Sequence, residues 1–237
     1  MTTLRVSRQP SGEPEIFHSL QGEGASIGVP TVFLRLAQCN LTCSWCDTKY
    51  TWDWKSFSFD NEVTALPVED VETRILSFDR PHLVITGGEP MMQQRALEPL
   101  VSSLCEKGFY CEVETNGTLV PSSEMVRSVS QWNVSPKLSN SGVDIARREV
   151  PRALRAYSSL ENAYFKFVIA EPQDVDEALD IVGRYAVASD RVILMPEGTE
   201  RRVTEERGPW VAGLCAEHGF RFSTRMHILL WGDKRGR

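Results

Sequence analysis

The chain has 237 residues, of which 41% are hydrophobic and 24% are charged. This composition supports a packed core and excludes global disorder. The formal net charge is −6, and the single short basic cluster, Lys234–Arg237, is predicted to be a solvated tail. We therefore expect no nucleic-acid partner, because nucleic-acid binders usually carry a large basic surface.

The sequence contains no apolar run of about 18 residues, the minimum for a membrane span. Residues 1–10 also lack the apolar core of a signal peptide. We therefore expect a cytoplasmic protein without a membrane partner. In a reducing compartment, clustered cysteines indicate a metal site rather than disulfides. Three of the six cysteines are clustered, and the scattered Cys105, Cys111 and Cys215 are predicted to be buried core residues.

Short β-branched or aromatic runs, each bounded by turn residues, predict six strands. Longer amphipathic runs between them predict five helices. The predicted strands, in chain order, are Val32–Leu36, His82–Ile85, Tyr110–Glu114, Trp132–Val134, Tyr164–Ile169 and Arg191–Met195. The predicted helices are Pro67–Phe78, Met91–Lys107, Ser122–Ser130, Asp174–Ala188 and Thr204–His218.

Alternation of strands and helices predicts an α/β fold with parallel strands and right-handed crossovers. A complete eight-repeat (β/α) barrel needs about 250 residues, so we expect an incomplete TIM-like barrel of about six parallel strands with helices outside. Residues 1–237 are predicted to form a single domain, with a variable insertion at about residues 50–66 that covers the site. The active site should lie at the carboxyl ends of the strands.

The first predicted parallel strand leads directly into Cys39, Cys43 and Cys46, spaced as Cys-x3-Cys-x2-Cys. Three thiolates at this spacing can hold a 4Fe–4S cluster and leave one iron without a protein ligand. An open coordination position distinguishes a catalytic metal centre from a structural one.

Two other metal sites are compatible with these cysteines. A structural zinc site needs a fourth ligand, and His18, Cys105, Cys111 or Cys215 would have to supply it without zinc-ribbon spacing. A simple electron-transfer cluster would need a fourth local cysteine.

The cysteine motif, with Trp45 before its last cysteine, resembles that of the radical S-adenosylmethionine superfamily. Residues Thr86–Pro90 (TGGEP) resemble that superfamily's glycine-glycine-glutamate turn, whose backbone contacts the methionine amino group of the cofactor. Glycine allows such a close approach. Taken alone, TGGEP is also typical of an ordinary turn into a helix with proline in its first turn.

A narrower resemblance covers nearly the whole chain. Glu15–Gly24 (EIFHSLQGEG), the Gly28–Pro30 and Phe33–Leu36 segments and the ending Cys46–Thr48 are similar to 7-carboxy-7-deazaguanine synthase. The resemblance implies a lyase that converts 6-carboxy-5,6,7,8-tetrahydropterin to 7-carboxy-7-deazaguanine, with loss of ammonia, in queuosine-type 7-deazapurine biosynthesis. It also implies a 4Fe–4S cluster, S-adenosylmethionine, Mg²⁺, an electron donor such as flavodoxin or ferredoxin, and a homodimer.

The resemblance also implies roles for individual residues. The pterin substrate would meet Leu20, Gln21, Gly22, Glu23, Arg35, Thr86 and His227, and Thr48 would bind Mg²⁺. S-adenosylmethionine would meet Trp45, Asp47, Gly88, Glu89, Glu114, Asn116, Ser135, Pro136, Lys137, Met195, Pro196, Glu197 and Gly198. A carboxylate suits the amino-pyrimidine edge of a pterin because it accepts two parallel N–H donors.

Several of these residues have plainer interpretations. Arg35 could be an ion-paired surface arginine, Thr48 a turn residue and Lys137 a surface lysine. His227, expected near the end of the last strand, could be an ordinary core or surface histidine. The residues after Trp231 continue beyond the point where certain relatives end, so we assign them no role.

Two other functions fit the cysteine motif. One is a radical activase that installs a glycyl radical on a protein partner. The other is a non-catalytic zinc or electron-transfer protein, which would bind metal without cleaving the cofactor.

Overall fold

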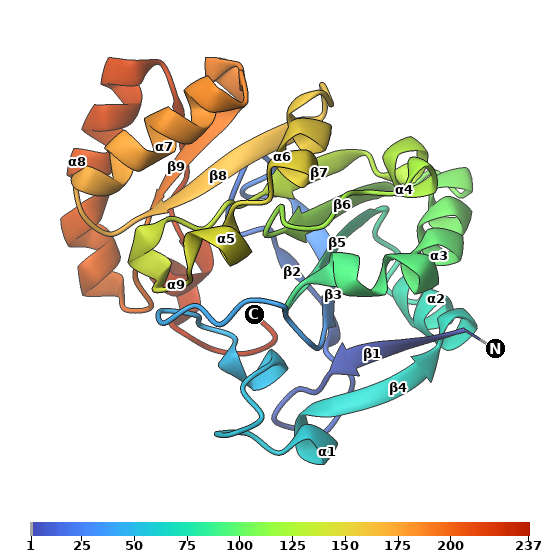
Figure 1. Ribbon diagram of the computed structural model, residues 1–237. Helices are drawn as coiled ribbons and strands as arrows, with labels where there is room; N and C mark the ends of the chain where they lie inside the picture. The colour runs from blue at the N-terminus through green and yellow to red at the C-terminus, as the bar shows by residue number, and fades with distance from the viewer. Residues whose placement is uncertain (1) are drawn as a thin grey trace.

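Six parallel strands form the centre of the structure, a computed structural model that describes residues 2–237. They are neighbours in chain order, and each pairs in parallel with the next (Figure 1). This confirms the predicted set of strands, with ends that differ by one or two residues. The strands are β3 (Pro30–Leu36), β5 (His82–Gly87), β6 (Tyr110–Thr115), β7 (Gln131–Val134), β8 (Ala163–Ile169) and β9 (Val192–Pro196).

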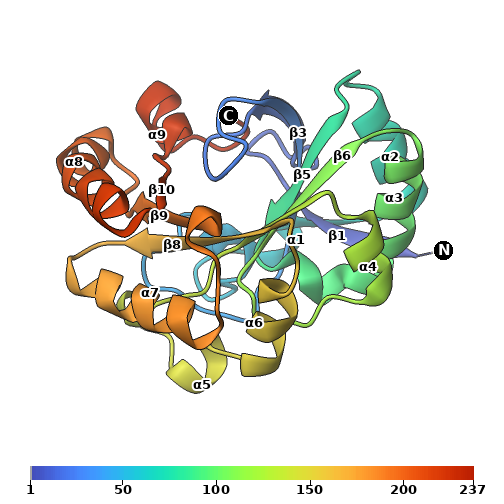
Figure 2. The same cartoon turned by 90° about the horizontal axis from the view of Figure 1, so that it is seen from above.

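Helices surround the outer face of this curved sheet, as Figure 2 shows from above. All five predicted helices are present, although the second begins as a 3-10 turn, Pro90–Gln93. The connecting helices are α2 (Val68–Leu76), α3 (Gln94–Glu106), α4 (Ser123–Ser128), α6 (Pro151–Ser158), α7 (Gln173–Arg184) and α8 (Arg201–His218). Of these, α6 had not been predicted, because Pro151 at its start and Arg152 and Arg155 within it obscure a short apolar face of Ala153, Leu154 and Tyr157.

Additional strands extend both edges of the parallel sheet. On one side, β1 (Thr3–Ser7), β2 (Ile16–Leu20) and β4 (Val63–Pro67) pair antiparallel to β3 or to each other. On the other side, β10 (Arg221–Phe222) pairs in parallel with β9. The sheet order is β10-β9-β8-β7-β6-β5-β3-β1-β4, so the barrel is not closed. Three short helices complete the fold: α1 (Phe59–Glu62), α5 (Ile145–Arg148) and α9 (Met226–Trp231).

The strands place alternate side chains on opposite faces, which sets the position of the site. In β3, Val32, Leu34 and Leu36 are fully buried in the main apolar core beneath the helices. Phe33 and Arg35 point to the other face, toward the concave side of the sheet. The parallel arrangement therefore decides which residues line the interior of the open barrel.

Two of the expectations about single residues need correction. Cys111 and Cys215 are buried as expected, but Cys105 is exposed on α3. The tail is not simply solvated, because Arg235 and Gly236 are half-buried against other segments. No helix among residues 2–237 is both long enough and apolar enough to cross a bilayer.

Candidate functional site

One cavity lies at the carboxyl ends of the parallel strands, where the fold class predicts the active site. It brings together all but three of the residues expected to form the site; Glu89, Pro136 and Pro196 do not line it. The expected residues that line it are Leu20, Gln21, Gly22, Glu23, Arg35, Cys39, Cys43, Trp45, Cys46, Asp47, Thr48, Thr86, Gly88, Glu114, Asn116, Ser135, Lys137, Met195, Glu197, Gly198 and His227.

The loop after β3 presents three free cysteines to this cavity. Cys43 packs with Leu41 and Val143 in a small apolar cluster. The backbone N–H of Leu41 lies 3.4 Å from the Cys39 sulfur. The indole N–H of Trp52 lies 3.3 Å from the Cys46 sulfur. Donors aimed at sulfur are typical of cluster-ligating cysteines, whose thiolates they stabilise.

Cys39, Cys43 and Cys46 all line the cavity, so they can offer one thiolate to each of three irons of a cluster. Among residues 2–237, no group of three or more His, Cys, Asp or Glu side chains is placed to hold a metal ion. Burial raises the pKa of the Cys39 thiol to about 12. Iron must therefore displace protons when it binds.

The turn after β5 packs directly against the cysteine loop. Gly87 has φ +135°, and a Cβ at this position would lie 2.0 Å from the Leu36 carbonyl oxygen. A Cβ at Gly88 would lie 2.1 Å from the Gln38 carbonyl oxygen. Only glycine can fill both positions, so the backbone of this turn lies beside the cysteines and faces the cavity.

The Glu89 side chain points into the protein and away from the cavity. It is fully buried and accepts hydrogen bonds from the Thr115 hydroxyl (2.8 Å), the Asn116 N–H (2.6 Å) and the Met91 N–H (3.0 Å). Burial raises its pKa. In this structure Glu89 holds two strand-end turns together, whereas the resemblance assigned it to the cofactor.

Arg35 lines the cavity and is held in place from behind. Its Nε donates to the Glu15 carboxylate at 2.9 Å. Glu15 is fully buried, and the Tyr50 hydroxyl lies 3.0 Å from both of its oxygens. Arg35 is therefore ion-paired but is not a surface residue, and the rest of its guanidinium is available to an anion.

Glu114 lies beside two residues that were expected to bind substrate. It accepts from the Thr86 hydroxyl at 2.7 Å and from the Gln21 amide at 3.2 Å. The same amide nitrogen donates to the buried Glu112 at 2.9 Å. The Gln21 side chain is only 2% exposed, so these carboxylates fix its orientation.

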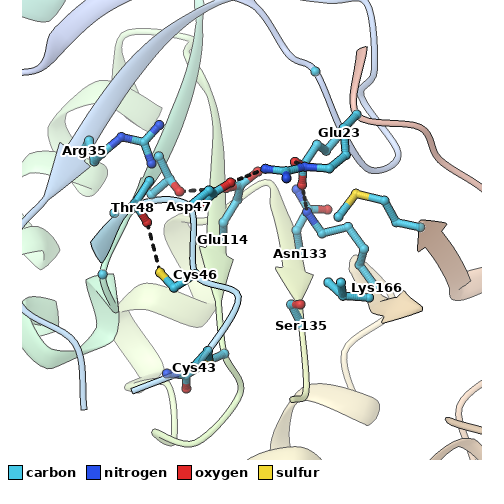
Figure 3. A pocket seen from close by; sticks show the side chains of 18 of the residues that line it. Glu23, Arg35, Cys43, Cys46, Asp47, Thr48, Glu114, Asn133, Ser135 and Lys166 are labelled. Carbon is cyan, nitrogen blue, oxygen red and sulfur yellow. Dashed lines mark hydrogen bonds and ion pairs between the residues drawn. The ribbon is translucent and has the colours of Figure 1, made fainter. Parts of the chain in front are cut away.

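Two cations that the sequence analysis missed form a charged network across the cavity (Figure 3). Lys166 pairs with Glu23, and Arg225 pairs with both Glu23 (3.0 Å) and Asp47. Burial opposes ionisation of Glu23, but Lys166, Arg225 and His227 outweigh it and keep the Glu23 pKa well below its usual range. The one available signal was Lys166 itself, a charged residue within the apolar strand AYFKFVI.

His227 lies in the first turn of α9 and not at the end of the last strand. It packs so closely on the loop after β2 that a Cβ at Gly22 would lie 2.3 Å from its ring nitrogen. The Met226 N–H also donates to the Gly22 carbonyl at 2.9 Å. Helix α9 therefore docks on the loop of Leu20–Gly24, and a small residue at position 22 is required.

Comparisons with known proteins agree with this geometry. Residues 35–205 match the model of the radical SAM superfamily. The chain is 41% identical to a 7-carboxy-7-deazaguanine synthase of Pyrobaculum aerophilum, over 94% of this chain and 96% of the relative. It is 34% identical to the synthase of Halobacterium salinarum, over 92% and 90% of the two chains. The crystal structure of QueE from Escherichia coli superposes with a TM-score of 0.70, at 28% identity and 96% coverage of both chains.

Proposed function

Because the chain belongs to the radical S-adenosylmethionine superfamily and, within it, to the 7-carboxy-7-deazaguanine synthases, we propose how its cavity carries out that activity. The reaction converts 6-carboxy-5,6,7,8-tetrahydropterin to 7-carboxy-7-deazaguanine with loss of ammonia, a carbon–nitrogen lyase reaction in 7-deazapurine biosynthesis. The observation that carries the proposal is that the three cysteines, the glycine turn and Arg35 line the same cavity.

Cys39, Cys43 and Cys46 would hold a 4Fe–4S cluster, and the chemistry that this cluster would supply is one-electron reduction of bound S-adenosylmethionine. The chain would position S-adenosylmethionine beside these cysteines. The backbone of Gly87 and Gly88 faces the cavity beside the cysteine loop, and Ser135 and Lys137 line the adjacent wall. The Lys137 ammonium lies 5.5 Å from the centre of the Trp45 ring and 3.0 Å from the Ser135 hydroxyl, which orients it toward this wall.

The substrate carboxylate binds at Arg35, and its pterin ring lies against the aromatic side chains of the concave face. Phe17 and Phe33 stack with their ring centres 5.2 Å apart and line the cavity next to Arg35. A guanidinium held by Glu15 on one side can still donate to a carboxylate on the other. Thr86 is the register partner of Arg35 on the neighbouring strand β5, and Gln21 lines the same cavity. Both can hydrogen-bond with the polar edge of the ring.

Mg²⁺ is proposed to bind at Thr48 together with the substrate carboxylate. The Thr48 hydroxyl lies 3.6 Å from the Cys46 sulfur, so an ion there would lie next to the cluster (Figure 3). Mg²⁺ commonly takes one or two protein oxygens and completes its shell with water and substrate oxygens. The ion would thereby orient the carboxylate relative to the radical.

A homodimer, a one-electron donor such as flavodoxin or ferredoxin, and a cytoplasmic location complete the proposal. A 4Fe–4S cluster would need an electron source to become reduced, and the free, clustered cysteines favour a reducing compartment. The activase alternative is less well supported, since the Leu20–Gly24 loop that it would not need lines the cavity and docks α9.

The direct test is an anaerobic assay of the reconstituted protein with S-adenosylmethionine, reductant, Mg²⁺ and the pterin. We expect 7-carboxy-7-deazaguanine by mass spectrometry from the wild type and from the matched control Cys105→Ala, whose cysteine is exposed on α3. Cys43→Ala should form neither product nor 5′-deoxyadenosine. Formation of 5′-deoxyadenosine without 7-carboxy-7-deazaguanine would refute the substrate, and absence of both from a cluster-loaded wild type would refute the activity.

A further inference from the structure

Residues 232–237, called the strap here, connect opposite sides of the open barrel. They follow α9, and the end of the chain lies among the blue N-terminal segments in both views (Figures 1 and 2). Arg235 anchors the strap by an ion pair of 2.7 Å with Glu62 in α1. Its guanidinium also lies 3.3 Å from the centre of the Tyr50 ring. Arg237, at the end of the strap, lines the cavity.

A continuous series of contacts leads from Arg235 to the cavity. The Tyr50 side chain is buried beneath the guanidinium, and its hydroxyl reaches both oxygens of Glu15 at 3.0 Å. Glu15 in turn accepts from the Arg35 Nε at 2.9 Å. Each partner is buried or half-buried, so water competes weakly for these contacts.

We propose that Arg235 is a positioning residue, which orients Arg35 toward the substrate carboxylate through Tyr50 and Glu15. The inference rests on the proposed function only in taking Arg35 as the partner of that carboxylate. A bidentate arginine–carboxylate contact depends on the direction of the guanidinium fork. Glu15 sets that direction, and Tyr50 fixes Glu15 by bonding both of its oxygens. A cation over the ring face limits the motion of Tyr50.

The charges of the network at the mouth of the cavity also act on the strap. Burial and the nearby Asp47 carboxylate raise the pKa of Asp233, while Arg225, His227 and Arg235 oppose this. These groups come from the cysteine loop, from α9 and from the strap itself.

The test measures recognition of the carboxylate separately from recognition of the pterin ring. Two fluorescent probes, 6-carboxypterin and pterin without the carboxylate, are titrated onto the reconstituted protein. Arg235→Gln should weaken 6-carboxypterin binding about tenfold, which corresponds to about 1.4 kcal/mol. Binding of the carboxylate-free pterin should not change. In the assay, KM for the substrate should rise by a similar factor while kcat changes less.

The matched control is Arg221→Gln, which removes an arginine lying 5.2 Å from the centre of the Tyr164 ring at the far sheet edge. It should leave both affinities unchanged. Arg235→Lys keeps a cation over Tyr50 and should recover most of the affinity. Tyr50→Phe should reproduce the loss, and the double variant should lose no more than the larger single effect, because both act on one series of contacts.

Three results would overturn the inference. Arg235→Gln could bind 6-carboxypterin with the affinity of the wild type, or its affinity for both probes could fall equally. Its effect on 6-carboxypterin affinity could also add to that of Tyr50→Phe. If Arg235→Gln does not fold, Arg235→Lys and Tyr50→Phe are compared in the same way. Failure of the wild type itself to bind either probe would instead refute the proposed substrate.

Discussion

Arg225 joins three segments of the cavity wall, so its replacement tests whether the charged network holds the site together. Its Nε pairs with Glu23 on the loop after β2, and one terminal nitrogen pairs with Asp47 beside the cysteines. The other donates to the Gly198 carbonyl, after β9, at 2.7 Å. Arg225→Met keeps much of the side-chain volume and removes all three contacts.

The expected cost follows from the burial of the partners. The Arg225 side chain is 9% exposed and that of Glu23 15%, whereas Asp47 at 30% keeps more hydration. Glu23 retains Lys166, so it is not left as an isolated buried charge. Hydrogen bonds to charged groups contribute about 1.5–3 kcal/mol each, and breaking a buried pair costs about 3–5 kcal/mol. We expect the free energy of unfolding to fall by about 3–5 kcal/mol.

The assay is thermal unfolding of the reconstituted protein under anaerobic conditions. For a chain of this size, 1 kcal/mol shifts Tm by about 2–4 °C, so Tm should fall by about 6–20 °C. The control is Arg202→Met, which removes an ion pair with Glu206 whose side chains are 74% and 60% exposed. Such pairs contribute little, and its Tm should stay within about 2 °C of the wild type. Equal Tm values for the two variants would refute the reasoning.

The same network predicts a defined response to acid. The folded-state pKa of Glu23 is lowered below the ordinary value of 4.5, so its contribution to stability is present above that pH and is lost as the pH falls toward the folded value. In anaerobic urea unfolding, the free energy of unfolding of the wild type should exceed that of Glu23→Gln by a constant amount between about pH 7 and 5. Below about pH 4.5 the margin should narrow by about 1.4 kcal/mol per pH unit. A constant margin down to pH 3 would contradict the assigned pKa shift.

Three further replacements test the cluster site. Trp52→Phe removes the indole N–H that lies 3.3 Å from the Cys46 sulfur. Since hydrogen bonds to sulfur favour the reduced cluster, the midpoint potential in an EPR-monitored titration should become more negative, and an unchanged value would count against the bond. Gly88→Ala places a Cβ 2.1 Å from a backbone oxygen. The substitution should lower the free energy of unfolding by about 1–3 kcal/mol and reduce the iron bound per chain. Normal iron content and an unchanged Tm would contradict the predicted clash. Glu89→Gln should also cost about 1–3 kcal/mol in urea unfolding. The affinity of this variant for S-adenosylmethionine, measured by calorimetry, should change little. A large loss of affinity would instead support a direct contact between Glu89 and the cofactor.

The six central strands could be predicted because each is a short run with β-branched or aromatic residues, bounded by turn residues, and each buries apolar side chains in the main core. The antiparallel strands β1, β2 and β4 could not. Their sequences are short and partly polar, and they become strands only because β3 and its neighbours offer free edges. Helix α9 was missed for a similar reason, since its six residues are stabilised by docking on the Leu20–Gly24 loop.

The residues of the candidate site also fall into two groups, those marked by a local sequence pattern and those brought together only by folding. The cysteine motif, the glycine turn and the QGEG element are local patterns, and each contributes residues that line the cavity. Lys166 and Arg225 were missed because their partners lie far away in the sequence, and no periodicity marks a residue that becomes important by ion pairing. The strap has the composition of a solvated tail, because a run of basic residues is usually hydrated when nothing packs against it.

The sequence by itself determined the fold class and the family and predicted the cluster ligands, because these depend on local spacing and on strand and helix periodicity. Only the tertiary structure decided which charges meet across the cavity, that Glu89 points inward, and that Arg235 lies over Tyr50. The physical reason is that burial and pairing are properties of segments brought together by folding. The energy of an ionised group depends on those neighbours and not on its position along the chain.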